Sequence, residues 1–219
     1  MTETGAELLE RVRAVIAGGT NRLVPLIAAG TAPRSALRAL AAEEHLIIRS
    51  DWRAFLVLAS QARGHAAREF FSSVAGGEGL ALAKLGGFAA ATGLSADELA
   101  AYRPSAGTQA YPSYVTWLTL NGNPEDALLA ILANFAEWGG YCATIADALR
   151  AHYGFDAEGT AFFDFFAEPA PELDELGLRA LDEALAAGWR PTTAIDYARL
   201  LHEYELLFWN TLADRPPAP

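Results

Sequence analysis

The chain has 219 residues, of which 52% are hydrophobic and 20% are charged, and its net charge is -11. This length suits one domain with a single core, and the acidic balance argues against nucleic acid or an anionic membrane as a partner. No basic stretch precedes an apolar one at the N-terminus, and no apolar run reaches the ~20 residues of a membrane span, so we expect a cytoplasmic protein.

Alanine and leucine dominate the sequence, and glycine and proline divide it into segments of ordinary helix length. No segment shows the period-two alternation that is typical of a strand. We expect helices over residues 6–17, 23–29, 31–48, 65–74, 78–92, 96–102, 112–120, 124–152, 171–187 and 191–212.

Two of these helix boundaries rest on short local signals. Ser50 and Asp51 either bend the third helix or start another, and the glycine-rich stretch at 76–79 separates the fourth helix from the fifth. With short loops and no linker, the helices predict one all-α bundle domain over residues 1–214. The proline-rich residues 215–219 are expected to form a flexible tail.

Three segments are similar to elements of one family. They are LRALAAEEHLII at residues 37–48, AYPSY at residues 110–114 followed by Trp138, and ELLFW at residues 205–209. In this order they resemble the TenA/thiaminase II (TENA/THI-4/PqqC-like) family of the heme-oxygenase-like superfamily, over nearly the whole chain. The resemblance implies a heme-oxygenase-like multi-helix bundle, assembled as a homodimer or homotetramer. It also implies a pocket for a small heterocycle, since TenA-type enzymes hydrolyse thiamin or aminopyrimidine breakdown products.

Two glutamates fall on polar positions of the family's pocket. Glu205 matches the glutamate that handles protons at the reacting pyrimidine, and burial in an apolar pocket would raise its pKa toward neutrality. Glu44 stands where the family has an aspartate that holds the pyrimidine amino group. A carboxylate one methylene longer can still accept that hydrogen bond. The alternative is that Glu43 and Glu44 form a charged pair on a helix surface.

Aromatic residues near these motifs would form the walls of the pocket. An aromatic lining suits a flat heterocycle through stacking and apolar burial, although aromatics in bundles are also ordinary core residues. The expected set is Tyr111, Tyr114, Trp138, Tyr141 and Phe166. Phe166 replaces a family tyrosine, which removes one hydroxyl donor from the pocket.

Ala136 is the main departure from the family pattern. Anchored on Trp138, the family's Cys-x-Trp element places its nucleophile at this position, and alanine cannot attack a substrate. The only cysteine, Cys142, lies six residues further on, about 240° round the helix. Cleavage of thiamin by a thiolate is therefore not expected. Glu137 is a candidate replacement, and whether it faces the pocket stays open.

Three functions remain open at this point. The first is a TenA-like hydrolase that relies on Glu205 and needs no cofactor or metal. The second is a diiron oxidase or oxygenase, whose branch has a histidine one or two turns after a glutamate. The chain has Leu82 and Leu85 at these positions after Glu78, so a complete ligand set is not expected. The third is a non-catalytic ligand-binding or regulatory protein, which would bind without turnover.

Overall fold

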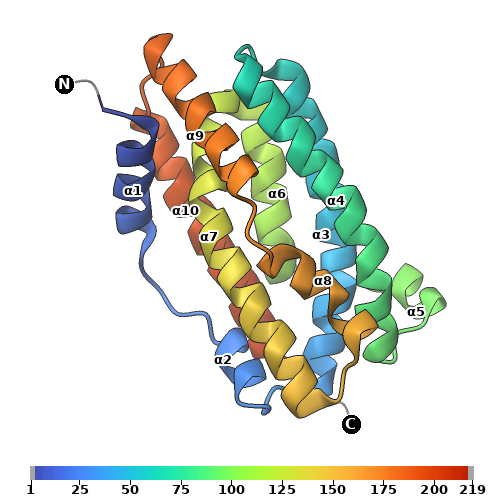
Figure 1. Ribbon diagram of the computed structural model, residues 1–219. Helices are drawn as coiled ribbons and strands as arrows, with labels where there is room; N and C mark the ends of the chain where they lie inside the picture. Colours follow the sequence, from blue (N-terminus) through green and yellow to red (C-terminus); the bar gives the residue numbers. More distant parts are fainter. Residues whose placement is uncertain (1–2, 217–219) are drawn as a thin grey trace.

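The computed structural model describes residues 3–216, which form helices joined by short loops (Figure 1). The helices are α1 (Gly5–Ile16), α2 (Leu23–Ala28), α3 (Arg34–Gln61), α4 (His65–Ala91), α5 (Ala96–Ala101), α6 (Ala106–Asn121), α7 (Pro124–Ala148), the π-helical turn η1 (Leu149–Tyr153), α8 (Ala157–Ala167), α9 (Pro171–Ala186) and α10 (Thr192–Ala213). No strand occurs within this described range, which confirms the predicted all-α class.

Several helices begin where a side chain accepts a hydrogen bond from a free amide of the first turn. Ser95 and Ser105 form capping boxes at the starts of α5 and α6. Asn123 accepts from the amide of Asp126 at the start of α7. Such caps stabilise a helix by about 0.5–2 kcal/mol each. Gly154, with a φ of 74°, ends η1 because a residue without Cβ tolerates this left-handed conformation.

Two predicted breaks are absent from the structure. α3 continues through Ser50 and Asp51, and Asp51 is buried inside the bundle. α4 is also continuous through residues 76–79, although each glycine costs a helix about 1 kcal/mol. Gly79 lies against the ring of Trp52, where an added Cβ would be 3.2 Å from the ring atom Cζ2. Packing of α4 against α3 therefore outweighs the local propensity of the glycines.

The start of α6 also differs from the prediction, and two residues of the predicted tail contact α3. α6 begins six residues early, at Ala106, so Pro112 lies inside it. Within the predicted tail, a guanidinium nitrogen of Arg215 lies 3.6 Å from the carboxylate of Glu43. The carbonyl of Pro216 accepts a hydrogen bond from a serine of α3 at 2.8 Å. Residues 217–219 of that tail lie outside the described residues.

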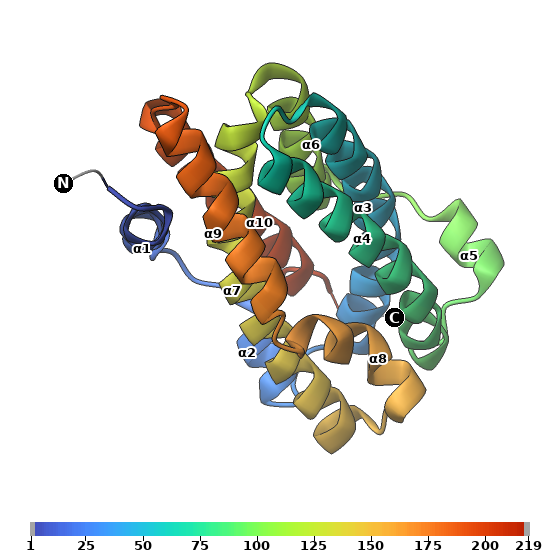
Figure 2. The same cartoon turned by 45° about the horizontal axis from the view of Figure 1, so that its top comes forward.

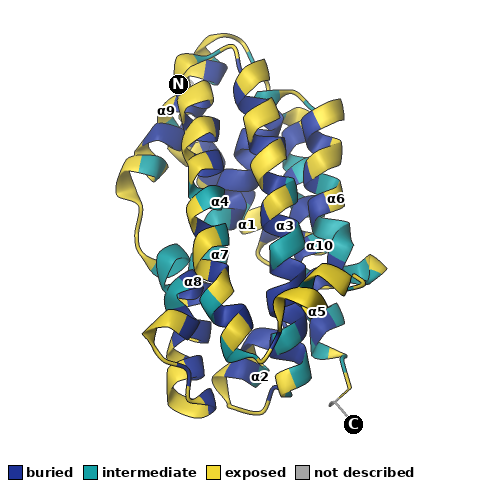
Figure 3. Cartoon of the chain, turned by 90° about the vertical axis from the view of Figure 1, so that its right-hand side faces the viewer, coloured by how far each residue is buried: buried dark blue, intermediate teal, exposed yellow. Residues whose placement is uncertain are grey.

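The long helices lie side by side as a bundle, with α8 and α9 along one side and α5 projecting outward (Figures 1 and 2). α3 packs along α4, and α10 packs along α6 and α7. Buried residues face the interior of this bundle, and exposed residues face outward (Figure 3). The apolar core consists of two clusters, and Tyr111 packs against both of them.

α7 and η1 together form a long apolar segment. By length and composition alone, Pro124–Tyr153 could cross a membrane, but half of its 18-residue apolar window is buried inside the bundle. A core helix of a globular protein passes the same test. The central place of α7 between α8 and α10 accounts for its hydropathy.

Candidate functional site

A cavity of about 830 Å³ lies between the long helices, with residues of both core clusters in its walls. Such a volume accommodates a small organic molecule. Among the residues predicted from the sequence, those that line the cavity are Glu44, Tyr111, Trp138, Phe166 and Glu205. These residues come from α3, α6, α7, α8 and α10, so the tertiary fold brings five separate segments to one site.

Glu205 is a cavity carboxyl group with a hydrogen-bond donor on each of its two oxygens. Its side chain is 5% exposed and lines the cavity from α10. The side-chain amide of Asn134 donates a hydrogen bond to Oε2, and the indole of Trp209 donates to Oε1 at 3.2 Å. Burial raises the pKa of Glu205 to about 7, against the lowering effect of these two hydrogen bonds. A carboxyl group that titrates near neutrality can both accept and release a proton.

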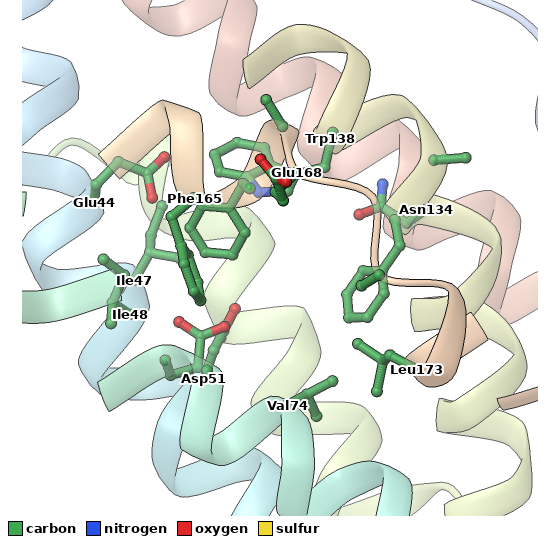
Figure 4. Close-up of a pocket in the computed structure, with 18 of the residues that line it drawn as sticks. Glu44, Ile47, Ile48, Asp51, Val74, Asn134, Trp138, Phe165, Glu168 and Leu173 are labelled. Carbon is green, nitrogen blue, oxygen red and sulfur yellow. The ribbon is translucent and has the colours of Figure 1, made fainter. Parts of the chain in front are cut away.

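Six further carboxyl groups line the cavity. Asp164, Glu168 and Asp174 belong to the segment of α8 and α9, and we call the other three, Glu44, Asp51 and Glu78, the acidic wall. Glu44 and Asp51 project into the cavity from α3 (Figure 4), whereas Glu78 is half-buried on α4. Burial raises the pKa of Asp51 to about 8. Burial, and then the negative charge of Asp51, raise the pKa values of Glu44 and Glu78 well above the usual range.

Tyr111 lies among these carboxyl groups. Its phenol has a pKa raised well above 10, mainly by burial and then by the charges of the four surrounding acids. The phenol therefore stays protonated near neutral pH and can donate a hydrogen bond. This donor lines the cavity from α6 beside Asp51, where it lowers the pKa of that carboxyl group against the larger effect of burial.

The structure places three predicted site residues away from the cavity wall. Tyr114 stacks on Trp117, with ring centroids 5.7 Å apart. Tyr141 packs edge-on against Trp209, also with a centroid separation of 5.7 Å. Glu137 does not line the cavity either. Since Ala136 lines it, the next residue points about 100° away round α7.

Glu137 instead lies beside His202 on the outer side of Glu205. Its Oε2 is 3.1 Å from Nδ1 of His202, but the two atoms are not aligned as a hydrogen bond. Nε2 of His202 donates to the carbonyl of Gly18 at 2.7 Å. Within residues 3–216, the group whose ligand atoms could hold a metal ion is Glu137, His202 and Glu205. His65 is exposed at the start of α4, where it contacts only Glu69 of the same helix among acidic groups.

The cavity carries no thiol within the described residues. Ala136 occupies the position expected for the family's nucleophile and lines the cavity. Cys142 is fully buried elsewhere on α7, and burial raises its thiol pKa well above the usual range. A thiol in that environment is a poor nucleophile.

Sequence reasoning missed Asp51, Asn134 and the place of Glu78 in the cavity. Asp51 carried a usable signal, because it is seven residues after Glu44 and two helical turns place both on one face. Asn134 carried none, since its role depends on how α7 faces α10. Glu78 was considered only as a metal ligand.

The helical bundle thus encloses a cavity with acidic and aromatic walls. Residues 22–214 match the TENA/THI-4/PQQC family, and the chain belongs to that family. A sequence comparison with curated proteins finds no match.

Solved structures support the same fold. A TenA family transcription regulator from Silicibacter sp. TM1040 superposes with a TM-score of 0.72 at 19% identity, covering 95% of this chain and 97% of that one. A TenA homolog from Pseudomonas syringae pv. tomato gives 0.72 at 11% identity, with coverages of 95% and 90%. A domain with a heme oxygenase-like fold from Shewanella denitrificans gives 0.69 at 14% identity, with coverages of 96% and 87%. At these identities the likeness concerns the fold alone.

Proposed function

We propose that the protein binds a small amino-substituted heterocycle, of the aminopyrimidine or thiamin-related class, and hydrolyses a carbon–nitrogen bond of it. The observation that carries this proposal is Glu205, a buried carboxyl group on the cavity wall with a pKa of about 7. Family membership supports the ligand class. Because Ala136 replaces the nucleophile, the attacking group in this proposal is water.

The proposed proton path uses Glu205 twice. Its carboxylate takes a proton from a water molecule, whose oxygen attacks the carbon that bears the leaving nitrogen. The resulting carboxylic acid then gives the proton to that nitrogen as the bond breaks, so an alcohol and an amine or ammonia are released. Asn134 and Trp209 hold the carboxyl group through both steps, since each donates a hydrogen bond to one of its oxygens.

The cavity walls support a flat ligand. Trp138 and Phe166 line the cavity and pack edge-to-face, with centroids 5.5 Å apart, so the ring of a heterocycle would contact aromatic carbon. Glu44 can accept a hydrogen bond from an exocyclic amino group, and Tyr111 can donate one to a ring nitrogen. Each of these groups already faces the cavity.

The test is an assay of purified protein with thiamin and a panel of aminopyrimidines, following release of the pyrimidine alcohol and of amine. Glu205→Gln should lower kcat by about 10²–10⁴-fold with little change in KM. Glu203→Gln, on the exposed face of the same helix, is the matched control and should keep the wild-type rate. If no ligand of this class raises the melting temperature, the proposal is wrong. Saturable binding that survives Glu205→Gln without any turnover would instead identify a non-catalytic binding protein.

Three other expectations stay predictions. They are a cytoplasmic location, activity without a cofactor or metal, and assembly as a homodimer or homotetramer. Exposed apolar side chains on α3 and α6, among them Trp52, Leu56, Trp117 and Leu120, are surface that a second copy of the chain would cover. Sedimentation velocity would give the oligomeric state.

A further inference from the structure

Asp51 is buried at the cavity without a complete set of partners. The residue is 3% exposed, lines the cavity and projects into it from α3 (Figure 4). Its Oδ1 has no hydrogen-bond partner in the described part of the chain. Buried polar atoms of proteins are nearly always satisfied, so an orphan acceptor aimed into a cavity indicates a group that a ligand supplies.

Glu43, which precedes Glu44 and lies about two turns before Asp51 on α3, shows that the fold can satisfy a buried carboxylate on this helix. Glu43 is fully buried, and it accepts hydrogen bonds from the hydroxyl of Tyr102 at 2.7 Å and from the amide of Gln109 at 3.0 Å. Arg215 adds a positive charge at 3.6 Å. Among residues 3–216, no basic side chain forms an ion pair with the acidic wall, so these buried carboxyl groups differ from Glu43 in lacking a compensating positive charge.

The basic side chains that line the same cavity have their partners outside the acidic wall, although Nε of Arg13 has no hydrogen-bond partner within the described residues. A guanidinium nitrogen of Arg13 pairs with Glu10 at 3.0 Å. The ammonium group of Lys84 lies over the ring of Phe165, 5.8 Å from its centroid. Within residues 3–216 neither forms an ion pair with the acidic wall. The cavity therefore presents uncompensated acceptors on one side.

The chemistry of these acceptors selects one kind of cation. Glu44, Asp51 and Glu78 are separate carboxyl groups on two helices, α3 and α4. An alkylammonium group has three N–H donors that diverge toward separate acceptors, whereas a planar amidinium matches the two oxygens of one carboxylate. We propose that the cavity recognises its ligand through a primary alkylammonium group, which Glu44, Asp51 and Glu78 hold together. This deepens the proposed function, since it uses the same cavity, but it does not depend on hydrolysis at Glu205.

Binding of such a group is coupled to proton release. Burial raises the pKa of Asp51 to about 8, so Asp51 carries a proton in the free protein below that pH. The titratable groups that face it are Glu44 on its own helix, Glu78 on α4, Tyr111 on α6 and Glu205 on α10. An ammonium group favours the ionised carboxylate, so binding expels the proton of Asp51 together with any that Glu44 and Glu78 hold. For each proton released, affinity rises as much as tenfold per pH unit below pH 8.

Isothermal titration calorimetry with three probes tests this proposal. The probes are 2-phenylethylamine, its uncharged isostere 2-phenylethanol, and benzamidine as the planar cation. Repeating each titration near pH 6.5 in buffers of different ionisation enthalpy counts the protons released. The amine should bind at least about tenfold more tightly than the alcohol and the amidine, with release of one or more protons.

Variants assign that binding to the acidic wall. Asp51→Asn should weaken the amine about tenfold or more and lower the number of protons released, and Glu44→Gln should also weaken binding. Asp174→Asn is the matched control, because Asp174 also lines the cavity but is exposed at the start of α9. Glu205→Gln should leave amine binding intact, which separates this proposal from the proposed hydrolysis.

Two outcomes would overturn the proposal. One is absence of amine binding to the wild-type protein, which would leave hydrolysis of an uncharged heterocycle at Glu205 untouched. The other is equal amine affinity in the wild type, Asp51→Asn and Glu44→Gln, which would place the ammonium group outside the acidic wall. Circular dichroism spectra of each variant establish that the helical fold is retained.

Discussion

Replacing Asp51 by asparagine should change how the stability of the protein depends on pH. Burial raises the pKa of Asp51 to about 8, whereas an aspartate in an unfolded chain titrates near pH ~4. Between these values the folded state holds a proton that the unfolded state has released. The free energy of unfolding therefore falls as pH rises through this window, by about 1.4 kcal/mol per pH unit for one such group. From about pH 5 to pH 7 this amounts to about 3 kcal/mol, against a typical total of about 5–15 kcal/mol.

Urea unfolding at several pH values between about 5 and 8 measures this effect. Asp51→Asn stays neutral throughout, so its stability should fall by about 3 kcal/mol less than that of the wild type from pH 5 to pH 7. Glu205, with a pKa raised to about 7, keeps a residual slope in both proteins. Asp97→Asn, on the exposed helix α5, should follow the wild type. Parallel curves for the wild type and Asp51→Asn would refute the reasoning, because Asp51 would then have the same pKa in both states.

Two further predictions concern α7 and α4. Ala136→Cys places a thiol on the cavity wall, so iodoacetamide should label this variant while the buried Cys142 keeps the wild type unlabelled. Equal labelling of the variant and the wild type, measured by mass spectrometry, would contradict the placement of residue 136 on the cavity side of α7. Gly87→Ala brings a Cβ within 2.3 Å of the Glu158 carbonyl and should destabilise folding by about 1–3 kcal/mol. Gly86→Ala meets open space and should stabilise it by up to about 1 kcal/mol. The urea midpoints of the two variants measure this difference. A higher midpoint for Gly87→Ala than for Gly86→Ala would show that α4 and α8 pack differently.

The helices could be predicted wherever local chemistry decides them. Caps such as Ser95 and terminal glycines such as Gly154 act within a few residues, so their effect is visible in the sequence. The continuous course of α3 through Asp51, and of α4 through residues 76–79, depends on contacts between helices distant in sequence. Local propensity cannot report those contacts, and it therefore predicted breaks that the structure lacks.

The candidate site shows the same division. Glu44, Tyr111 and Glu205 belong to segments that resemble a family, and all three line the cavity. Glu137 was predicted as a site residue only because it follows Ala136 in the sequence. A step of one residue along a helix rotates the side chain by about 100°, and this rotation places Glu137 beside His202 and not in the cavity. The position of such a residue requires the rotation of α7 in the bundle, which no spacing within α7 determines.

The donors around Glu43 have a consequence for mapping the site by mutation. Glu43 and Glu44 are adjacent on α3, so fixing the direction of one side chain fixes the rotation of the helix about its axis and the direction of the other. The contact between Glu43 and Arg215 therefore links the direction of the Glu44 side chain to the position of residue 215. A mutational scan would find Glu43 essential for ligand affinity although it never touches the ligand, and an affinity tag fused directly after Arg215 could disturb binding from outside the cavity.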